Sequence, residues 1–95
     1  MLTSENVKSI YELLCSLAQP NRMRILEILH KHTELNVADL CGIIQLDQGL
    51  VSHHLRVLTQ CKLLEMRKSG KNTFYSINYI RWAQVRSAVG DLASD

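Results

Sequence analysis

Residues 36–61 read NVADLCGIIQLDQGLVSHHLRVLTQC and contain two apolar stripes at helical spacing. Asn36, with Asp39 three residues later, resembles a capping arrangement that opens a short helix. Asp47 is suited to cap a second, longer helix that continues to about residue 61. A tight turn at residues 45–47 joins the two. This layout is typical of a helix-turn-helix, whose second helix enters the major groove of DNA.

Helical periodicity also precedes this segment. Apolar residues that include Tyr11 and Leu14 predict an amphipathic helix over about residues 4–18. Pro20 ends that helix, because proline lacks an N–H and restricts the residue before it. The same proline is tolerated in the first turn of a second helix, which we expect to run to about His32.

The period changes after residue 62. Leu63–Lys68 and Thr73–Ile77 are rich in apolar and aromatic residues and read as two strands, with a turn over residues 69–72. Asn78 is suited to cap a last helix. That helix would carry one apolar face, made of Trp82, Val85, Val89 and Leu92. A hairpin directly after a helix-turn-helix is a wing, so the sequence predicts a mainly α, winged helix-turn-helix fold with about five helices and a two-stranded β-hairpin.

Length and composition are those of an ordinary globular protein. The 95 residues make one domain, and 46% of them are hydrophobic and 21% charged. A chain this short buries a modest core, so a partner subunit that covers apolar surface would stabilise it. No apolar run approaches the roughly 18 residues of a membrane span, and residues 1–5 do not resemble a signal peptide. We therefore expect a cytoplasmic protein with no membrane partner.

Positive charge is concentrated in one part of the chain. Five of the 11 lysines and arginines lie between Arg56 and Lys71, although the net charge is only +2. A local basic surface on a nearly neutral protein indicates a polyanionic partner, most simply nucleic acid.

The helix that begins after Asp47 divides into two faces at about 100° per residue. One broad apolar stripe comprises Leu50, Val51, His54, Leu55, Val57, Leu58 and Cys61. Gln48, Ser52, Arg56 and Thr59 lie opposite, with Gly49 and His53 at the flank. The adjacent histidines therefore face different environments. We expect a buried, hydrogen-bonded His54 and an accessible His53.

The polar face is suited to reading DNA. Glutamine can pair with adenine, arginine with guanine, and serine with bases or phosphates. Gly49 would let the first turn approach the groove closely, and that turn offers free N–H groups to a phosphate. The predicted DNA-binding residues are Gln48, Gly49, Ser52, His53 and Arg56 on the helix, and Arg67, Lys68, Lys71 and Asn72 on the wing.

Four segments together carry a family resemblance. Residues 20–26, 36–40, 51–55 and 70–75 read PNRMRIL, NVADL, VSHHL and GKNTFY, in the order seen in winged-helix repressors of the ArsR/SmtB family. The chain resembles that family over about residues 7–92. The resemblance implies a homodimer formed through the first and last helices, residues 1–18 and 79–95. It also implies binding of double-stranded DNA at a pseudo-palindromic operator, and repression of transcription.

Matching position by position, the resemblance assigns Gln48, Gly49, Ser52 and His53 to the recognition helix and Lys71 and Asn72 to the wing tip. The chain departs from metal-sensing members, which carry Cys-Val-Cys where this sequence has Asn36-Val37-Ala38. An amide and a methyl group cannot replace thiolate ligands. The last helix also lacks histidine and cysteine, so we expect no conventional metal site and no cofactor.

The three cysteines, Cys15, Cys41 and Cys61, are widely spaced and do not form a disulfide framework. Cys41 and Cys61 fall on apolar stripes and read as small buried hydrophobes. Cys15 lies at the margin of its stripe. A metal, thiol or redox site built on Cys15, with Cys61 or a cysteine of a partner subunit, is therefore an alternative to a repressor without a metal.

Two other classes of function are less consistent with the sequence. A winged helix can serve as a protein-interaction module, although the basic face argues against that use here. An enzyme is the least consistent class, because the chain has no nucleophile–base arrangement, phosphate-binding glycine loop or paired carboxylates on one face. Our leading hypothesis is a sequence-specific, dimeric DNA-binding repressor.

Overall fold

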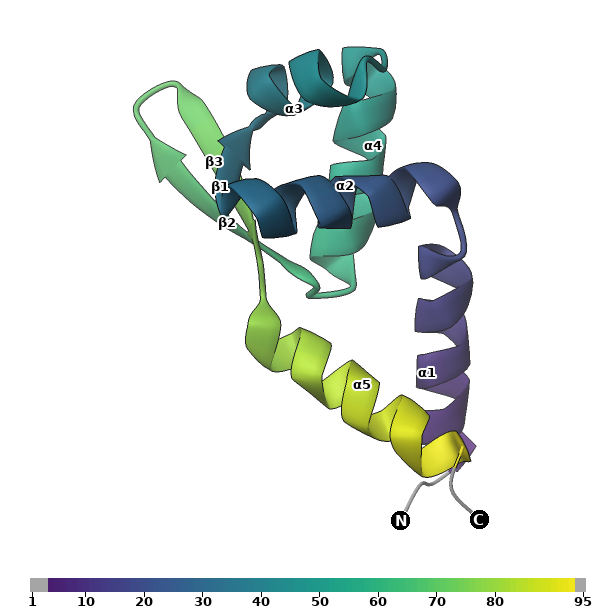
Figure 1. Ribbon diagram of the computed structural model, residues 1–95. Helices are drawn as coiled ribbons and strands as arrows, with labels where there is room; N and C mark the ends of the chain where they lie inside the picture. The colour runs from purple at the N-terminus through teal and green to yellow at the C-terminus, as the bar shows by residue number, and fades with distance from the viewer. Residues whose placement is uncertain (1–3, 94–95) are drawn as a thin grey trace.

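The computed structural model describes residues 4–93, with side chains over residues 8–91. Its elements are α1 (Ser4–Leu17), α2 (Pro20–His32), β1 (Glu34–Asn36), α3 (Val37–Ile44), α4 (Gln48–Gln60), β2 (Leu64–Ser69), β3 (Asn72–Ile77) and α5 (Tyr79–Ala93) (Figure 1). The mainly α winged fold predicted from the sequence is confirmed. The ends of the predicted dimerisation helices, residues 1–3 and 94–95, lie outside the described residues, as does the side chain of Leu92.

Side-chain caps begin four of the helices. The Asn36 side chain accepts a hydrogen bond from the backbone N–H of residue 39 at 2.8 Å, and Asn78 accepts one from residue 81 at 3.1 Å. Asp47 accepts from the N–H of residue 49 at 3.0 Å, so all three predicted caps are confirmed. Gln19 caps α2 in the same way, accepting from residue 21 at 2.7 Å. Each bond satisfies an N–H that has no partner within its own helix.

The sheet contains one strand more than the sequence predicted. β2 and β3 form the wing hairpin around Gly70, whose φ of 62° suits glycine. β1 then pairs with the other edge of β3, giving an antiparallel sheet in the order β1-β3-β2. The prediction of a two-stranded sheet was therefore incomplete. A strand of three residues shows no recognisable alternation of apolar and polar side chains.

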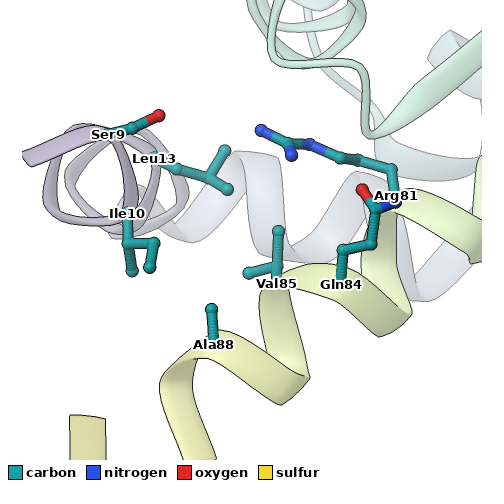
Figure 2. A pocket seen from close by; sticks show the side chains of 7 residues that line it. All are labelled: Ser9, Ile10, Leu13, Arg81, Gln84, Val85 and Ala88. Carbon is teal, nitrogen blue, oxygen red and sulfur yellow. The ribbon is translucent and has the colours of Figure 1, made fainter. Parts of the chain in front are cut away.

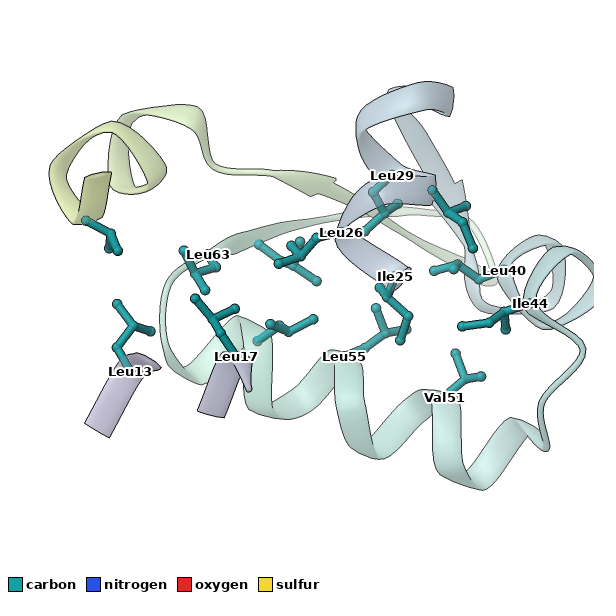
Figure 3. Close-up of a cluster of buried hydrophobic side chains, with 14 residues drawn as sticks. Leu13, Leu17, Ile25, Leu26, Leu29, Leu40, Ile44, Val51, Leu55 and Leu63 are labelled. Carbon is teal, nitrogen blue, oxygen red and sulfur yellow. The ribbon is translucent and has the colours of Figure 1, made fainter. Parts of the chain in front are cut away.

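The core lies where α2, α3 and α4 meet the base of the wing (Figure 3). The most deeply buried large side chains are Ile25, Leu29, Leu40, Val51, Leu55, Leu58 and Leu63. α4 contributes three of these, and α3 packs against it, so the two helices of the helix-turn-helix are held in one rigid unit.

One residue of the predicted α4 stripe is exposed, and Val57 and Cys61 are half-buried. Leu50 is 40% exposed, whereas Val51, Leu55 and Leu58 are completely buried. Leu50 lies about 100° around the helix from Val51, at the margin of the buried arc. The assignment of Leu50 to the core was wrong, because the predicted apolar stripe is wider than the part of the α4 surface that packs against the rest of the protein.

α1 and α5 extend away from this core and approach each other at their far ends (Figure 1). Ile10, Leu13 and Val85 are buried. Tyr11, on the predicted apolar stripe of α1, is 67% exposed, and Leu14 is 39% exposed. On α5, Val89 of the predicted apolar face is 36% exposed. Both helices therefore retain apolar surface that the single chain does not cover. Within residues 4–93, no helix is both long and apolar enough to cross a membrane.

Candidate nucleic-acid interface

The polar face of α4, which we predict to contact DNA, faces solvent. Gln48, Gly49, His53 and Arg56 are exposed, and Ser52 is half-buried. A Cβ at Gly49 would lie 3.0 Å from the capping carboxylate of Asp47, so a larger residue would have to shift that carboxylate slightly. Glycine leaves the cap and the first turn of α4 unobstructed.

A groove separates α4 from the wing. Its walls are Ser52, Arg56, Thr59 and Gln60 of α4 and Met66 and Tyr75 of the hairpin, and it encloses about 350 Å³. Met66 pairs directly with Tyr75, and Lys68 pairs with Thr73. Side chains two apart on a strand lie on the same face, so Lys68 projects from the face that carries Met66. The wing therefore presents Lys68 on the side of α4.

Arg67 lies on the opposite face of the wing, where its side chain forms an ion pair within the protein. Its guanidinium donates two hydrogen bonds to Glu34 of β1, at 2.8 and 3.1 Å, and lies 4.9 Å from the centre of the Phe74 ring. These hydrogen bonds lower the pKa of the Glu34 carboxyl group. In the structure Arg67 links the three strands, and its contact with DNA, expected from the sequence, stays a prediction. Glu34 could not be identified as its partner without knowledge of β1.

Lys71 and Asn72 directly follow Gly70 at the wing tip, and both are exposed. The turn therefore presents one cation and one amide at the far end of the hairpin. This position suits contact with a phosphate or a narrow groove next to the site that α4 would occupy.

The histidine doublet is divided as the helical geometry predicted. His54 is only 2% exposed, whereas His53 is exposed. Nδ1 of His54 accepts a hydrogen bond from Nε of Arg22 at 3.1 Å, and Arg22 also donates to the Ser16 carbonyl at 2.8 Å. Arg22 therefore links the end of α1 to the middle of α4. The prediction of a buried, hydrogen-bonded His54 is confirmed, while the role of Arg22 gave no signal in the sequence.

Burial, with the charge of Arg22 and the neighbouring His53, lowers the pKa of His54. The unfolded chain therefore takes up this proton first as the pH falls. The stabilisation by neutral His54 is complete above about pH 6.5 and is lost as the pH falls from there through the lower folded pKa.

We expect His54→Asn to flatten the dependence of the free energy of unfolding on pH between about 7.5 and 5. The asparagine Oδ1 can still accept the Arg22 hydrogen bond but does not titrate. Urea unfolding of both proteins across this range measures the effect. If the free energy of unfolding changed with pH in the same way in the variant and the wild type, His54 would not contribute to the pH dependence.

The cysteines are all free thiols. Cys15 is exposed, as the sequence indicated, whereas Cys41 and Cys61 are half-buried. His30 hydrogen-bonds to Tyr79 at 2.8 Å. Within the part of the chain that the structure describes, no group of three or more His, Cys, Asp or Glu side chains is placed to hold a metal ion.

A capped helix with an exposed polar face, packed on a shorter helix and followed by a basic hairpin, defines a winged helix-turn-helix protein. Residues 19–66 match the family described as bacterial regulatory proteins of the arsR family. The chain belongs to this family.

Named relatives agree with this assignment. The chain is 31% identical over 77 residues to a transcriptional repressor SmtB homolog of Synechocystis, a match covering 81% of this chain and 58% of that protein. It is 40% identical over 67 residues to the transcriptional repressor PagR of Bacillus anthracis, covering 70% of this chain and 67% of PagR. The chain thus spans less than two thirds of the length of the SmtB homolog.

Solved structures share the fold over most of the chain. The crystal structure of PagR superposes with a TM-score of 0.72 at 31% identity, covering 90% of this chain and 99% of that one. A possible transcriptional regulator for arsenical resistance gives a TM-score of 0.74 at 30% identity, covering 84% and 82%.

Proposed function

We propose that the protein is a homodimeric, sequence-specific DNA-binding repressor of transcription that acts in the cytoplasm. The observation that carries this proposal is the exposed polar face of α4, which adjoins a groove leading to the basic wing. Both relatives described above are named transcriptional repressors, which supports the same function. The test is tight, salt-sensitive binding to a specific DNA fragment, which requires the side chains of α4.

In this proposal α4 enters the major groove. Gln48, Ser52, His53 and Arg56 read base edges or adjacent phosphates, and the free N–H groups of the first turn bind a phosphate. Lys68 and Lys71 of the wing neutralise the DNA backbone and hold the protein in register. Arg67 acts through Glu34, keeping the wing attached to β1.

Neutralised phosphates make binding depend on salt. Lys71→Ala should weaken binding to specific and scrambled DNA about equally, and should reduce the slope of log affinity against log salt by about 0.9. Fluorescence anisotropy titrations between about 50 and 200 mM salt measure both quantities. Lys31→Ala, which removes an exposed lysine at the end of α2, outside the proposed dimer helices, is the matched control and should leave the slope unchanged. If Lys71→Ala has the same slope as the wild type, the wing tip does not contact a phosphate.

The dimer in this proposal uses α1 and α5. Figure 2 shows side chains of the two helices facing each other across a shallow groove, with Ile10 and Leu13 on α1 and Val85 and Ala88 on α5. Tyr11 and Leu14 remain exposed beside it. A second chain that covers this apolar surface would place two α4 helices for half-sites about 34 Å apart, one turn of DNA.

Leu14→Glu tests this interface. Because Leu14 is 39% exposed, the charge should leave the fold intact while opposing burial against a second chain. We expect a monomer in sedimentation velocity, and roughly 100-fold weaker binding to a two-half-site operator, since the bivalent advantage is lost. Circular dichroism checks the fold. A folded variant that still forms the wild-type dimer would contradict the proposed interface.

The exposure of Cys15 supports a second candidate, a repressor that responds to thiol-reactive agents or soft metals. In that case cadmium, arsenite or an oxidant would consume thiols stoichiometrically and weaken DNA binding, and Cys15→Ser would abolish the response. DNA affinity that stays unchanged while the thiols are consumed would exclude this candidate.

A further inference from the structure

A cavity of about 530 Å³ lies between α2 and α5, away from the reading face of α4. Its apolar lining includes Leu26 of α2, Ile77 at the end of β3, and Trp82 of α5. Leu26 is buried, and the other two are half-buried. This volume falls within the range of roughly 300–1,000 Å³ that is usual for small-molecule sites, whose walls are mostly apolar and aromatic.

The two helices that bound this cavity are joined at the end nearest the sheet. There His30 of α2 and Tyr79 of α5 form a hydrogen bond of 2.8 Å, and their rings meet edge to face with centroids 5.9 Å apart. From this link α2 and α5 diverge toward α1 (Figure 1). The cavity is therefore bounded by two helices that a polar contact joins at one end.

Arg86 offers the cavity a binding group for an anion. It is exposed and forms no ion pair with the described side chains, and its neighbour in the lining, His30, is already hydrogen-bonded to Tyr79. Glu27 is the only carboxylate among the lining residues. A lining that contains an arginine as well as apolar and aromatic side chains suits a flat molecule with one acidic group, because the guanidinium can bind a carboxylate or sulfonate while the ring of the ligand contacts Trp82.

We propose that this cavity is a binding site for a small aromatic anion, which acts as an effector of the protein. The effector role rests on the proposed DNA-binding function, whereas binding itself does not. α2 packs in the same core as α4, and α5 carries part of the proposed dimer surface. A ligand wedged between α2 and α5 would favour one angle between the dimer helices and the core, and so one spacing of the two α4 helices.

The test uses 8-anilinonaphthalene-1-sulfonate, an aromatic anion, as the probe with the full chain. Trp82 is the only tryptophan in the sequence and lines the cavity, so energy transfer from Trp82 reports that the probe is bound near this part of the chain, and the substitutions described next decide whether it occupies the cavity. We expect saturable transfer with one probe per chain. N-phenyl-1-naphthylamine, which has a similar aromatic body without the charge, should bind roughly fivefold more weakly.

Three substitutions locate the probe. Met23→Glu places a carboxylate at a 48% exposed rim position and should abolish saturable transfer without disturbing the core. Arg86→Gln should weaken binding of the anionic probe about fivefold and leave binding of the neutral probe unchanged. Glu27→Gln should strengthen binding of the anionic probe, since it removes a like charge. Arg24→Gln, exposed on α2 but outside the cavity lining, is the matched control and should bind as the wild type does.

Absence of saturable transfer would overturn the site, as would wild-type affinity in a folded Met23→Glu variant. Equal affinity for the charged and neutral probes would overturn the preference for an anion. Transfer that disappears as the dimer forms would show that a second chain, and not a small molecule, occupies the cavity.

Measurements of DNA affinity with and without the probe separate the effector role from the proposed function. The saturating probe should change the DNA affinity of the wild type at least threefold and leave that of Met23→Glu unchanged, a difference of about 0.7 kcal/mol in the wild type. Unchanged affinity with the cavity filled would overturn the effector role. Failure to bind DNA without any probe would instead count against the proposed function, while the fluorescence result would still decide the site.

Discussion

The double substitution Ser52→Ala/His53→Ala is expected to weaken binding to the specific operator by roughly 30-fold or more. Both side chains lie on the polar side of α4, where His53 is exposed and Ser52 lines the groove toward the wing. Each lost base contact costs about 1–3 kcal/mol of discrimination. Because the wing lysines remain, binding to scrambled DNA should change little, so specificity and not general affinity should collapse.

Anisotropy titrations of the operator and a scrambled duplex at the same salt concentration measure this ratio. His32→Ala provides a matched control, since His32 is exposed near the end of α2 and outside the predicted reading face. That control should bind both duplexes as the wild type does. If the double variant retains its preference for the operator, the polar face of α4 is not the surface that reads DNA.

Leu55→Ala is expected to cause the largest loss of stability, about 2–5 kcal/mol in the free energy of unfolding. Leu55 is completely buried at the centre of the cluster shared by α2, α3 and α4. Truncation removes apolar contacts and leaves a cavity in a part of the core that has little freedom to collapse. Since domains of this size are stable by only about 5–15 kcal/mol, a large fraction of the folded state depends on this side chain.

Leu50→Ala is the matched control on the same helix, because it makes the same chemical change at a 40% exposed position. We expect it to cost less than about 1 kcal/mol. Urea unfolding of the two variants measures both values. Equal losses would mean that Leu50 belongs to the core after all, and that the division between buried and marginal positions of α4 is wrong.

Sequence patterns that involve only a few neighbouring residues predicted much of this architecture. Asn36, Asp47 and Asn78 cap helices as expected, because a short polar side chain before an apolar stripe has a specific local function. The burial of His54 followed from helical geometry alone. The positions of Gln48, Ser52 and the other polar residues of α4 followed from the same geometry.

The features that the sequence did not reveal depend on contacts between distant segments. β1 exists because Glu34–Asn36 pairs with β3, about 40 residues away, and three residues carry no pattern of their own. Arg67 was grouped with Lys68 and Lys71 by charge. Adjacent residues on a strand point to opposite faces, and Arg67 meets Glu34 while Lys68 does not. Arg22 reaches His54 across 32 positions in the chain, which no local pattern indicates.

The most direct test of the central claim is to select DNA fragments from the genome of the source organism with the purified chain and to footprint them with hydroxyl radicals. We predict one enriched sequence with two related half-sites whose centres lie about 34 Å apart on one side of the duplex. The Ser52→Ala/His53→Ala variant should fail to enrich it. Enrichment of no fragment at low salt, or equal enrichment by the wild type and the double variant, would contradict the assignment of α4 as the helix that reads DNA.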